Sequence, residues 1–260
     1  MLSDYTPTEF THECKTKPVY VRGHGPAVIV MHEIPGITPE VVRFADWVVD
    51  AGFRVYMPLL VGKAGAPISG GYVMKSVATI CISREFHVLA SHSSSPVTDW
   101  LRALARHAHE EAGGKGVGAI GMCFSGNFAL SMMMEPALLA PVLCQPSMPL
   151  PLGETRKSAL HVSPAEFQCV KDRCAKGAKV LGLRFEGDKM SPQGKFDVLQ
   201  RELGSAFEGI VLEDRHANPD SFGGQAHSVV TNDLIDRDGE PTKEAAKRVI
   251  SFFVERLQTS

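Results

Sequence analysis

Residues 116–134 contain the cysteine that is best placed to act as a nucleophile. They read GVGAIGMCFSGNFALSMMM, so a short apolar strand is predicted to run into GMCFSG, with a helix directly after it. This is the pattern of a nucleophile elbow, in which the reacting residue lies at a sharp strand-to-helix turn and needs small neighbours two positions away. Gly121 and Ser125 satisfy that requirement. A buried cysteine is commonly a small core residue, but this setting favours Cys123 as a nucleophile, with its thiolate stabilised by the helix N-terminus.

A nucleophilic cysteine needs a base to take its proton and an acid to orient that base. Asp188 follows a glycine just after the strand predicted at 179–185, and His227 ends the glycine-rich segment GGQAH after the last predicted strand. Ligands bind at the carboxyl ends of the strands in open α/β sheets. Cys123, Asp188 and His227 are therefore predicted to form a catalytic triad.

Other acids and histidines compete for these roles. Asp197 falls within a predicted helix, Asp214 at the end of a strand, and His216 also lies near the last strand. Each residue taken singly could be a solvated surface group. The chain order nucleophile, acid, histidine, together with the loop settings and neighbouring glycines, favours Asp188 and His227.

The segment HEIPG at residues 32–36 follows the first clear buried strand. In an elbow-type site the loop after an early strand provides one N–H of the oxyanion hole, and the residue after the nucleophile provides the other. Ile34 and Phe124 are the predicted donors. An acid such as Glu33 near a cysteine is costly unless it is paired or has a function. The alternative is a surface carboxylate beside a turn.

The elements that must position these residues alternate between short apolar runs and longer helical patterns. Such alternation predicts a doubly wound, mostly parallel α/β sheet, here within one domain spanning residues 1–260. Strands are predicted at 26–32, 53–57, 116–121, 139–144, 179–185 and 209–213. Helices are predicted at 39–52, 97–112, 164–175 and 192–203, with a final helix capped by Thr242. The glycine-rich stretch 59–96 shows no periodicity, and a connection of this length is usually a lid or binding segment.

The composition is that of an ordinary globular protein, with 44% hydrophobic residues, 22% charged residues and a formal net charge of -2. We expect no nucleic-acid partner, because no basic cluster is present. We expect no membrane partner, because no apolar run approaches the roughly 20 residues of a membrane helix. The start, MLSDYTPTEF, is not a signal-peptide pattern, so a cytoplasmic location is expected.

The cysteines and histidines do not follow a metal-binding pattern. The six cysteines are scattered, and Cys169 and Cys174 are too far apart for a CxxC site. The ten histidines include no HExxH spacing, and His107 and His109 would lie on different faces of one helix. Neither a metal nor another cofactor is expected, and the predicted partner is a small-molecule substrate.

The segments HEIPGI, GMCFSG, FEGD and AHS, in this order over nearly the whole chain, resemble the dienelactone hydrolase family. The resemblance implies an α/β-hydrolase fold without a large separate cap domain, and cleavage of an ester or lactone through an acyl-cysteine. It implies Cys123, Asp188 and His227 as the triad. It also implies that Glu33 accepts the proton of a resting neutral thiol when substrate binds.

Two positions depart from the family pattern. The elbow commonly ends in Gly-Gly, where this chain has Ser125 and Gly126. The family also holds a substrate carboxylate with two arginines. Thr231 occupies the position of one, and Arg84 is the candidate for the other. Aryl esters or phosphotriesters are therefore alternative substrates, and a non-catalytic binder of hydrophobic ligands is an alternative function. The oligomeric state stays open.

Overall fold

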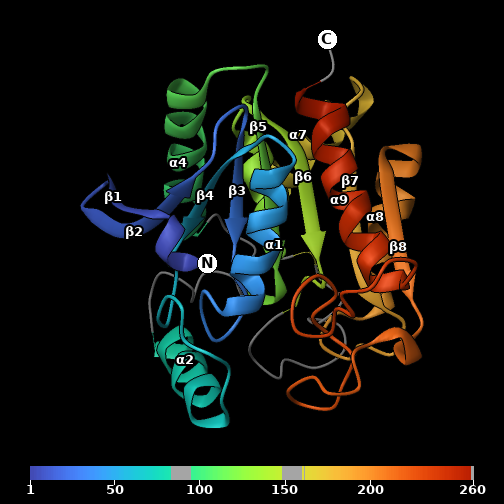
Figure 1. Ribbon diagram of the computed structural model, residues 1–260. Coiled ribbons are helices and arrows are strands. Elements are labelled where there is room, and N and C mark those ends of the chain that lie inside the picture. The colour runs from blue at the N-terminus through green and yellow to red at the C-terminus, as the bar shows by residue number, and fades with distance from the viewer. Residues whose placement is uncertain (83–94, 148–159, 161, 259–260) are drawn as a thin grey trace.

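The computed structural model describes residues 1–82, 95–147, 160 and 162–258, and it contains one eight-stranded sheet with the order β1-β2-β4-β3-β5-β6-β7-β8 (Figure 1). β4, β3, β5, β6, β7 and β8 pair in parallel, whereas β1 and β2 pair antiparallel to each other and β2 pairs antiparallel to β4. The strands are β1 (Thr6–His12), β2 (Lys15–Arg22), β3 (Ala27–Met31), β4 (Arg54–Pro58), β5 (Val117–Met122), β6 (Leu138–Cys144), β7 (Val180–Phe185) and β8 (Phe207–Leu212). The predicted mostly parallel sheet is confirmed.

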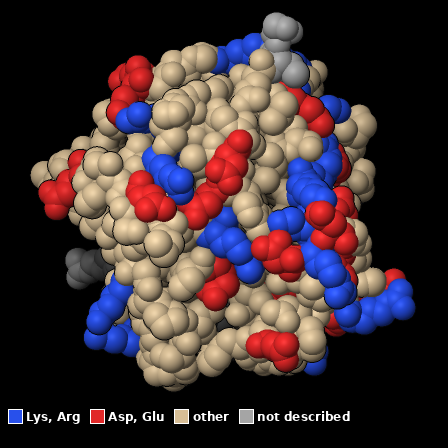
Figure 2. Space-filling view, in the orientation of Figure 1, with Lys and Arg blue, Asp and Glu red and all other residues tan. Residues whose placement is uncertain are grey.

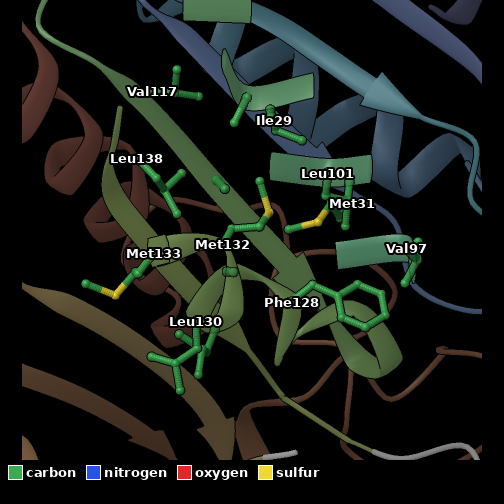
Figure 3. Close-up of a cluster of buried hydrophobic side chains, with 14 of the residues drawn as sticks. Ile29, Met31, Val97, Leu101, Val117, Phe128, Leu130, Met132, Met133 and Leu138 are labelled. Carbon is green, nitrogen blue, oxygen red and sulfur yellow. The ribbon is translucent and has the colours of Figure 1, made fainter. Parts of the chain in front are cut away.

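Helices cover both faces of the sheet, which explains why the parallel strands read as continuous apolar runs. They are α1 (Pro39–Asp50), α2 (Gly70–Ile82), α4 (Pro96–Ala112), α5 (Phe128–Ser131), α7 (Pro164–Ala175), α8 (Gln193–Leu203) and α9 (Pro241–Leu257). α4, α5, α7 and α8 pack on one face, and α1 and α9 on the other. Each face of the sheet has its own hydrophobic core. In β3, Ile29 and Met31 belong to the core under α4, α5, α7 and α8 (Figure 3), and Val28 and Val30 belong to the core under α1 and α9.

Six of the strands lie within two residues of their predicted bounds, but the β1–β2 hairpin was not predicted. Most β1 side chains are exposed, so the strand carries no clear alternation of apolar residues. Its turn is also unusual, because Glu13 and Cys14 adopt φ values of 46° and 61° where glycine or asparagine is the common choice.

The stretch predicted without periodicity contains a helix. α2 occupies part of it, and Ser76 of this helix donates a hydrogen bond of 2.9 Å to the carbonyl oxygen of Pro35. The glycine pair at its start gives no helix signal, so α2 depends on contacts with the rest of the fold. Arg84 lies outside the described residues.

The predicted cap of the last helix is wrong by two residues. α9 begins at Pro241 with Glu240 in the N-cap position, because Thr242 instead accepts a hydrogen bond of 3.0 Å from the Ile235 N–H. Thr242 therefore fastens the preceding loop to the first turn of the helix.

Basic and acidic side chains are interspersed on the face shown in Figure 2, in keeping with the near balance of charges in the sequence. No helix in the described ranges combines the length and the apolar character needed to cross a membrane.

Candidate active site

Cys123 occupies a strained turn at the carboxyl end of β5. Its φ of 55° falls in the left-handed region that residues other than glycine seldom adopt. A Cβ atom on Gly121 would lie 2.1 Å from the Ser125 carbonyl oxygen, and one on Gly126 would lie 2.6 Å from the Pro146 Cα. The tight turn that the GMCFSG pattern predicts is therefore present, and it leaves no room for side chains at these two glycines.

The helix after the turn is shorter than predicted. Cys123–Ser125 form a 3₁₀ turn, α5 is four residues long, and Met132–Met134 form another 3₁₀ turn. So short a helix aligns few peptide dipoles, and its contribution to a thiolate at Cys123 is correspondingly small.

Ser125 fastens the elbow to the end of β3. Its hydroxyl accepts a hydrogen bond of 2.9 Å from the Met122 N–H, and it lies 3.1 Å from the carbonyl oxygens of both Met31 and His32. The serine at this position therefore has a structural role that a glycine could not perform.

Gly121→Ala is expected to destabilise the protein by about 1–3 kcal/mol, because the added methyl group forces the elbow backbone to shift. Chemical denaturation monitored by circular dichroism would measure the change in the free energy of unfolding. Gly70→Ala is the matched control, since a Cβ atom there meets nothing within 4 Å. Equal stability of the two variants would contradict the steric account of the elbow.

Asp188 and His227 are brought together although 39 positions separate them in the sequence. The Asp188 Oδ2 lies 2.7 Å from the His227 Nδ1, and its Oδ1 accepts hydrogen bonds from the Met190 and Ser191 N–H groups at 2.9 and 3.2 Å. Burial alone would raise the pKa of the Asp188 carboxyl, but the bond to His227 and these amides hold the pKa below its ordinary value.

The other ring nitrogen of His227, Nε2, is buried and has no hydrogen-bond partner among the described residues. Burial alone would lower the pKa of His227, but the charge of Cys123 and the hydrogen bond to Asp188 raise the pKa well above its ordinary value. The Cys123 sulfur itself lies 3.0 Å from the Ser147 Oγ. The ring nitrogen that a catalytic base would use thus makes no hydrogen bond to a described residue. His227 lines the same cavity as Cys123, whose sulfur contacts a serine hydroxyl.

Glu33 is buried, with 2% of its surface exposed, which excludes a surface carboxylate. Ser228 Oγ donates a hydrogen bond of 2.6 Å to Oε2, Thr231 Oγ1 donates another to Oε1, and the Gln145 Nε2 lies 3.4 Å from Oε2. Burial raises the pKa of the Glu33 carboxyl, and the two hydroxyl donors offset only part of that effect. This carboxyl therefore binds a proton more strongly than an exposed glutamate does.

A cavity of about 750 Å³ connects Glu33 with the side chains of Cys123, Ser147, Asp188 and His227. Its apolar lining includes Ile34, Ile68, Val73, Val77, Met190 and Phe222. Two of these come from α2, so part of the segment predicted to be a lid or binding segment lines the cavity.

The sequence matches the model of the dienelactone hydrolase family over residues 15–162, which is more than half of the chain. The chain belongs to the dienelactone hydrolase family. It is accordingly a hydrolase, and the family resemblance found in the sequence is confirmed. The matched region contains Glu33 and Cys123, whereas Asp188 and His227 lie beyond its end.

Solved structures of hydrolases share the fold of this dienelactone hydrolase family member. A candidate dienelactone hydrolase from Klebsiella pneumoniae has a TM-score of 0.62 at 19% identity, covering 96% of this chain and 98% of its own. A dienelactone hydrolase-like promiscuous phosphotriesterase from metagenomic libraries has a TM-score of 0.61 at 15% identity, covering 97% of this chain and 98% of its own. A thermostable esterase has a TM-score of 0.60 at 14% identity, covering 98% of this chain and 64% of its own. No curated protein matches the sequence.

The positions that depart from the family pattern have visible consequences here. Thr231, in place of an arginine, uses its hydroxyl to bind Glu33. The cations that line the described part of the cavity are Lys189 and Arg215. Arg215 pairs with Glu213, and both of these side chains are largely exposed.

The predicted oxyanion donors follow the expected chain positions. Ile34 lines the cavity beside Glu33, and Phe124 is buried directly after Cys123. Their role in binding an oxyanion stays a prediction. Within the described ranges, no group of three or more histidine, cysteine, aspartate or glutamate side chains could hold a metal ion.

The competing acids and histidine have other contacts. Asp214 Oδ1 accepts a hydrogen bond of 2.9 Å from the Gly187 N–H and so supports the loop that carries Asp188. Asp197 accepts a hydrogen bond of 2.9 Å from the Gln193 amide on the exposed side of α8. His216 lies in a short turn and is not among the cavity-lining residues.

Three residues of the site were missed by sequence reasoning. Ser147 follows β6 and also donates its backbone N–H to the Cys123 carbonyl oxygen at 3.0 Å. Gln145, at φ 33°, accepts a hydrogen bond of 3.3 Å from the Val229 N–H while its amide faces Glu33. Asp233 accepts hydrogen bonds from the His227 and Ser228 N–H groups at 2.9 and 2.6 Å. Their place after a strand end was the only available signal for Gln145 and Ser147.

Proposed function

We propose that this hydrolase cleaves carboxylic esters or lactones through an acyl intermediate on Cys123. The observation that carries the proposal is the 2.7 Å contact between Asp188 and His227, whose opposite ring nitrogen has no partner among the described residues, at a cavity lined by both His227 and Cys123. An imidazolium held at Nδ1 by a carboxylate can donate its Nε2 proton to a leaving group, and the neutral imidazole that remains presents Nε2 as a proton acceptor. The raised pKa of His227 favours the imidazolium before the attack.

In the proposed reaction the Cys123 thiolate attacks the carbonyl carbon, and the Ile34 and Phe124 N–H groups stabilise the oxyanion that forms. Collapse of this tetrahedral species breaks the carbon–oxygen bond, and the alkoxide takes the Nε2 proton of the His227 imidazolium. Water then attacks the thioester while the neutral His227 removes its proton, and the sulfur leaves as a thiolate. Glu33 returns the thiol proton to Cys123 and so restores the resting site. In a lactone the alkoxide stays attached to the acyl group and is released with it.

Glu33 is proposed to accept the thiol proton when substrate enters. Its burial and its raised pKa make it a stronger proton acceptor than an ordinary carboxylate, in support of this role. The carboxyl must exchange its bonds to Ser228 and Thr231 for contact with Cys123 during this step. Substrate in the cavity would drive that exchange.

Glu33→Gln is expected to lower kcat by roughly 10²–10⁴-fold, the usual cost of losing an acid–base group. The glutamine keeps the shape of the side chain but cannot take up the proton, so KM should change much less. Steady-state kinetics between pH 5 and 9 would test this, with Thr231→Val as a control that removes one partner of the carboxyl without removing the carboxyl. Unaltered turnover of Glu33→Gln at every pH would reject the proton-acceptor role.

The same variant has a signature in stability. Because the pKa of Glu33 is raised in the folded protein, its protonated form adds stability at low pH, and this contribution is lost as the pH rises through the folded pKa. The ordinary pKa of a glutamate carboxyl is 4.5. As the pH rises from this value toward neutrality, the wild-type protein should therefore lose stability relative to Glu33→Gln. Thermal unfolding at a series of pH values would measure it.

Hydrolysis of a panel of alkyl esters, aryl esters, lactones and phosphotriesters, with Cys123→Ala measured in parallel, tests the proposed function. Ester or lactone turnover that disappears in the variant is the expected result. The absence of turnover on every ester and lactone by the wild-type protein would refute the proposal.

Neutral aryl esters or phosphotriesters are a second substrate class that one observation favours. Thr231 binds Glu33 where the family pattern has an arginine, and the cavity wall is rich in apolar side chains. An uncharged substrate suits such a wall better than a carboxylate does.

A further inference from the structure

His32 follows β3 and is fully buried, and both of its ring nitrogens contact the backbone. Its Nε2 lies 3.0 Å from the Leu60 nitrogen and 3.4 Å from the Val61 nitrogen. Its Nδ1 lies 2.7 Å from the Glu33 carbonyl oxygen. The proposed reaction assigns no step to this histidine, and His32 does not line the cavity. Any effect on the site must therefore pass through the backbone groups that the ring binds.

These contacts determine which ring nitrogen carries the proton. The N–H groups of Leu60 and Val61 can only donate, so Nε2 is the acceptor and carries no proton. The proton is then on Nδ1, which donates it to the Glu33 carbonyl oxygen. Burial lowers the pKa of His32 to about 4, so the ring stays neutral in this tautomer at neutral pH.

The Glu33 carbonyl oxygen belongs to the same peptide group as the Ile34 N–H, which is a predicted oxyanion donor. In a planar trans peptide the carbonyl and the N–H point in opposite directions. The bond from His32 therefore fixes this peptide from one side and leaves its N–H directed away from the ring. Ile34 lines the cavity together with Cys123, and its N–H donates no backbone hydrogen bond within the described ranges.

His32 also contacts the nucleophile elbow. The Ser125 hydroxyl lies 3.1 Å from the His32 carbonyl oxygen, and the His32 ring lies against the ring of Phe124, with 5.9 Å between the ring centroids. Phe124 is the residue that contains the other predicted donor. The two segments that contribute the predicted oxyanion donors therefore meet at His32.

We propose that His32 is a positioning residue that holds the Glu33–Ile34 peptide in the orientation in which the Ile34 N–H binds the oxyanion. This inference rests on the proposed acyl-cysteine reaction. A bond to the carbonyl oxygen also polarises the peptide, which makes its N–H a stronger donor. Because the oxyanion exists only in the tetrahedral species, loss of this bond should lower kcat much more than it alters KM.

Two conservative variants separate the two sides of the ring. In His32→Gln the amide reaches the position of Nε2, so it can accept from Leu60 and Val61 but leaves the Glu33 carbonyl without its donor. In His32→Asn the amide reaches the position of Nδ1, so it can donate to Glu33 but leaves the two N–H groups without an acceptor.

The two variants should rank in opposite order in activity and in stability. His32→Gln should lower kcat by roughly 10–10²-fold, with KM changed much less, and His32→Asn should rescue most of that loss. His32→Asn should nevertheless unfold at the lower temperature, because two N–H groups of buried residues lose their acceptor. Steady-state kinetics and thermal unfolding would measure both. A wild-type kcat in His32→Gln, or losses of kcat that follow the losses of stability, would overturn the proposal.

A second measurement uses the wild-type protein and covers the case in which neither variant folds. NMR spectra that correlate ring protons and nitrogens of labelled histidine should show a proton on Nδ1 of His32 and none on Nε2, without titration between pH 5 and 9. The opposite tautomer would overturn the proposal. A failure of the proposed hydrolysis would appear instead as full turnover in Cys123→Ala, so the two failures are distinguishable.

Discussion

Cys123→Ala is expected to lose ester or lactone turnover by roughly 10⁴-fold or more, while its thermal unfolding stays close to that of the wild-type protein. The variant removes the sulfur that forms the acyl intermediate, but alanine tolerates the turn about as well as cysteine does. Cys123→Ser should also be far slower than the wild-type protein, because a serine hydroxyl is much harder to ionise than a thiol. Steady-state and single-turnover kinetics would measure both effects.

Cys169→Ala is the matched control for this prediction. It removes a half-buried thiol from α7, whose sulfur lies 3.8 Å from the Met133 carbonyl oxygen. This variant should retain wild-type rates. A wild-type rate in Cys123→Ala would instead refute the acyl-cysteine mechanism as a whole.

His227→Ala is expected to cost nearly as much turnover as the double variant of His227 and Asp188. Asp188 acts on the reaction through the ring that it orients, so its contribution disappears once that ring is removed. A double-mutant cycle on kcat/KM would measure this coupling. His216→Ala should be close to the wild-type enzyme, because His216 does not line the cavity.

A double variant whose loss equals the product of two independent losses would contradict the assignment of at least one of these residues. Asp214 and His216 would then be the next positions to test, since both follow the last strand of the sheet. Asp214 already contacts the backbone of the loop that carries Asp188.

The location of the candidate site could largely be predicted from local sequence. A strand followed by GMCFSG predicts the turn at Cys123, because the turn is so tight that it requires small residues on both sides of the cysteine. The loops that carry Asp188 and His227 were recognisable because each follows a predicted strand and contains glycine. The apolar runs of β3 to β8 identified the parallel sheet for a related reason, since both faces of these strands are buried.

Elements that depend on distant contacts were not predictable in this way. The exposed β1 strand carries no apolar alternation, and α2 begins with two glycines, so neither has a local signal. β1 is stabilised by its pairing with β2, and α2 is stabilised by contacts such as the hydrogen bond from Ser76 to the Pro35 carbonyl oxygen.

The sequence by itself determined the fold class, the elbow and the residue types of the proposed triad, because these depend on patterns within short segments. Only the tertiary structure decided which side chains surround them. Ser147 meets the Cys123 sulfur, and Gln145 faces Glu33. Partners of this kind come from segments far apart in the chain, and their residue types are equally common on surfaces. Their burial, and with it the shift of each pKa, exists only once the sheet has brought its strand ends together.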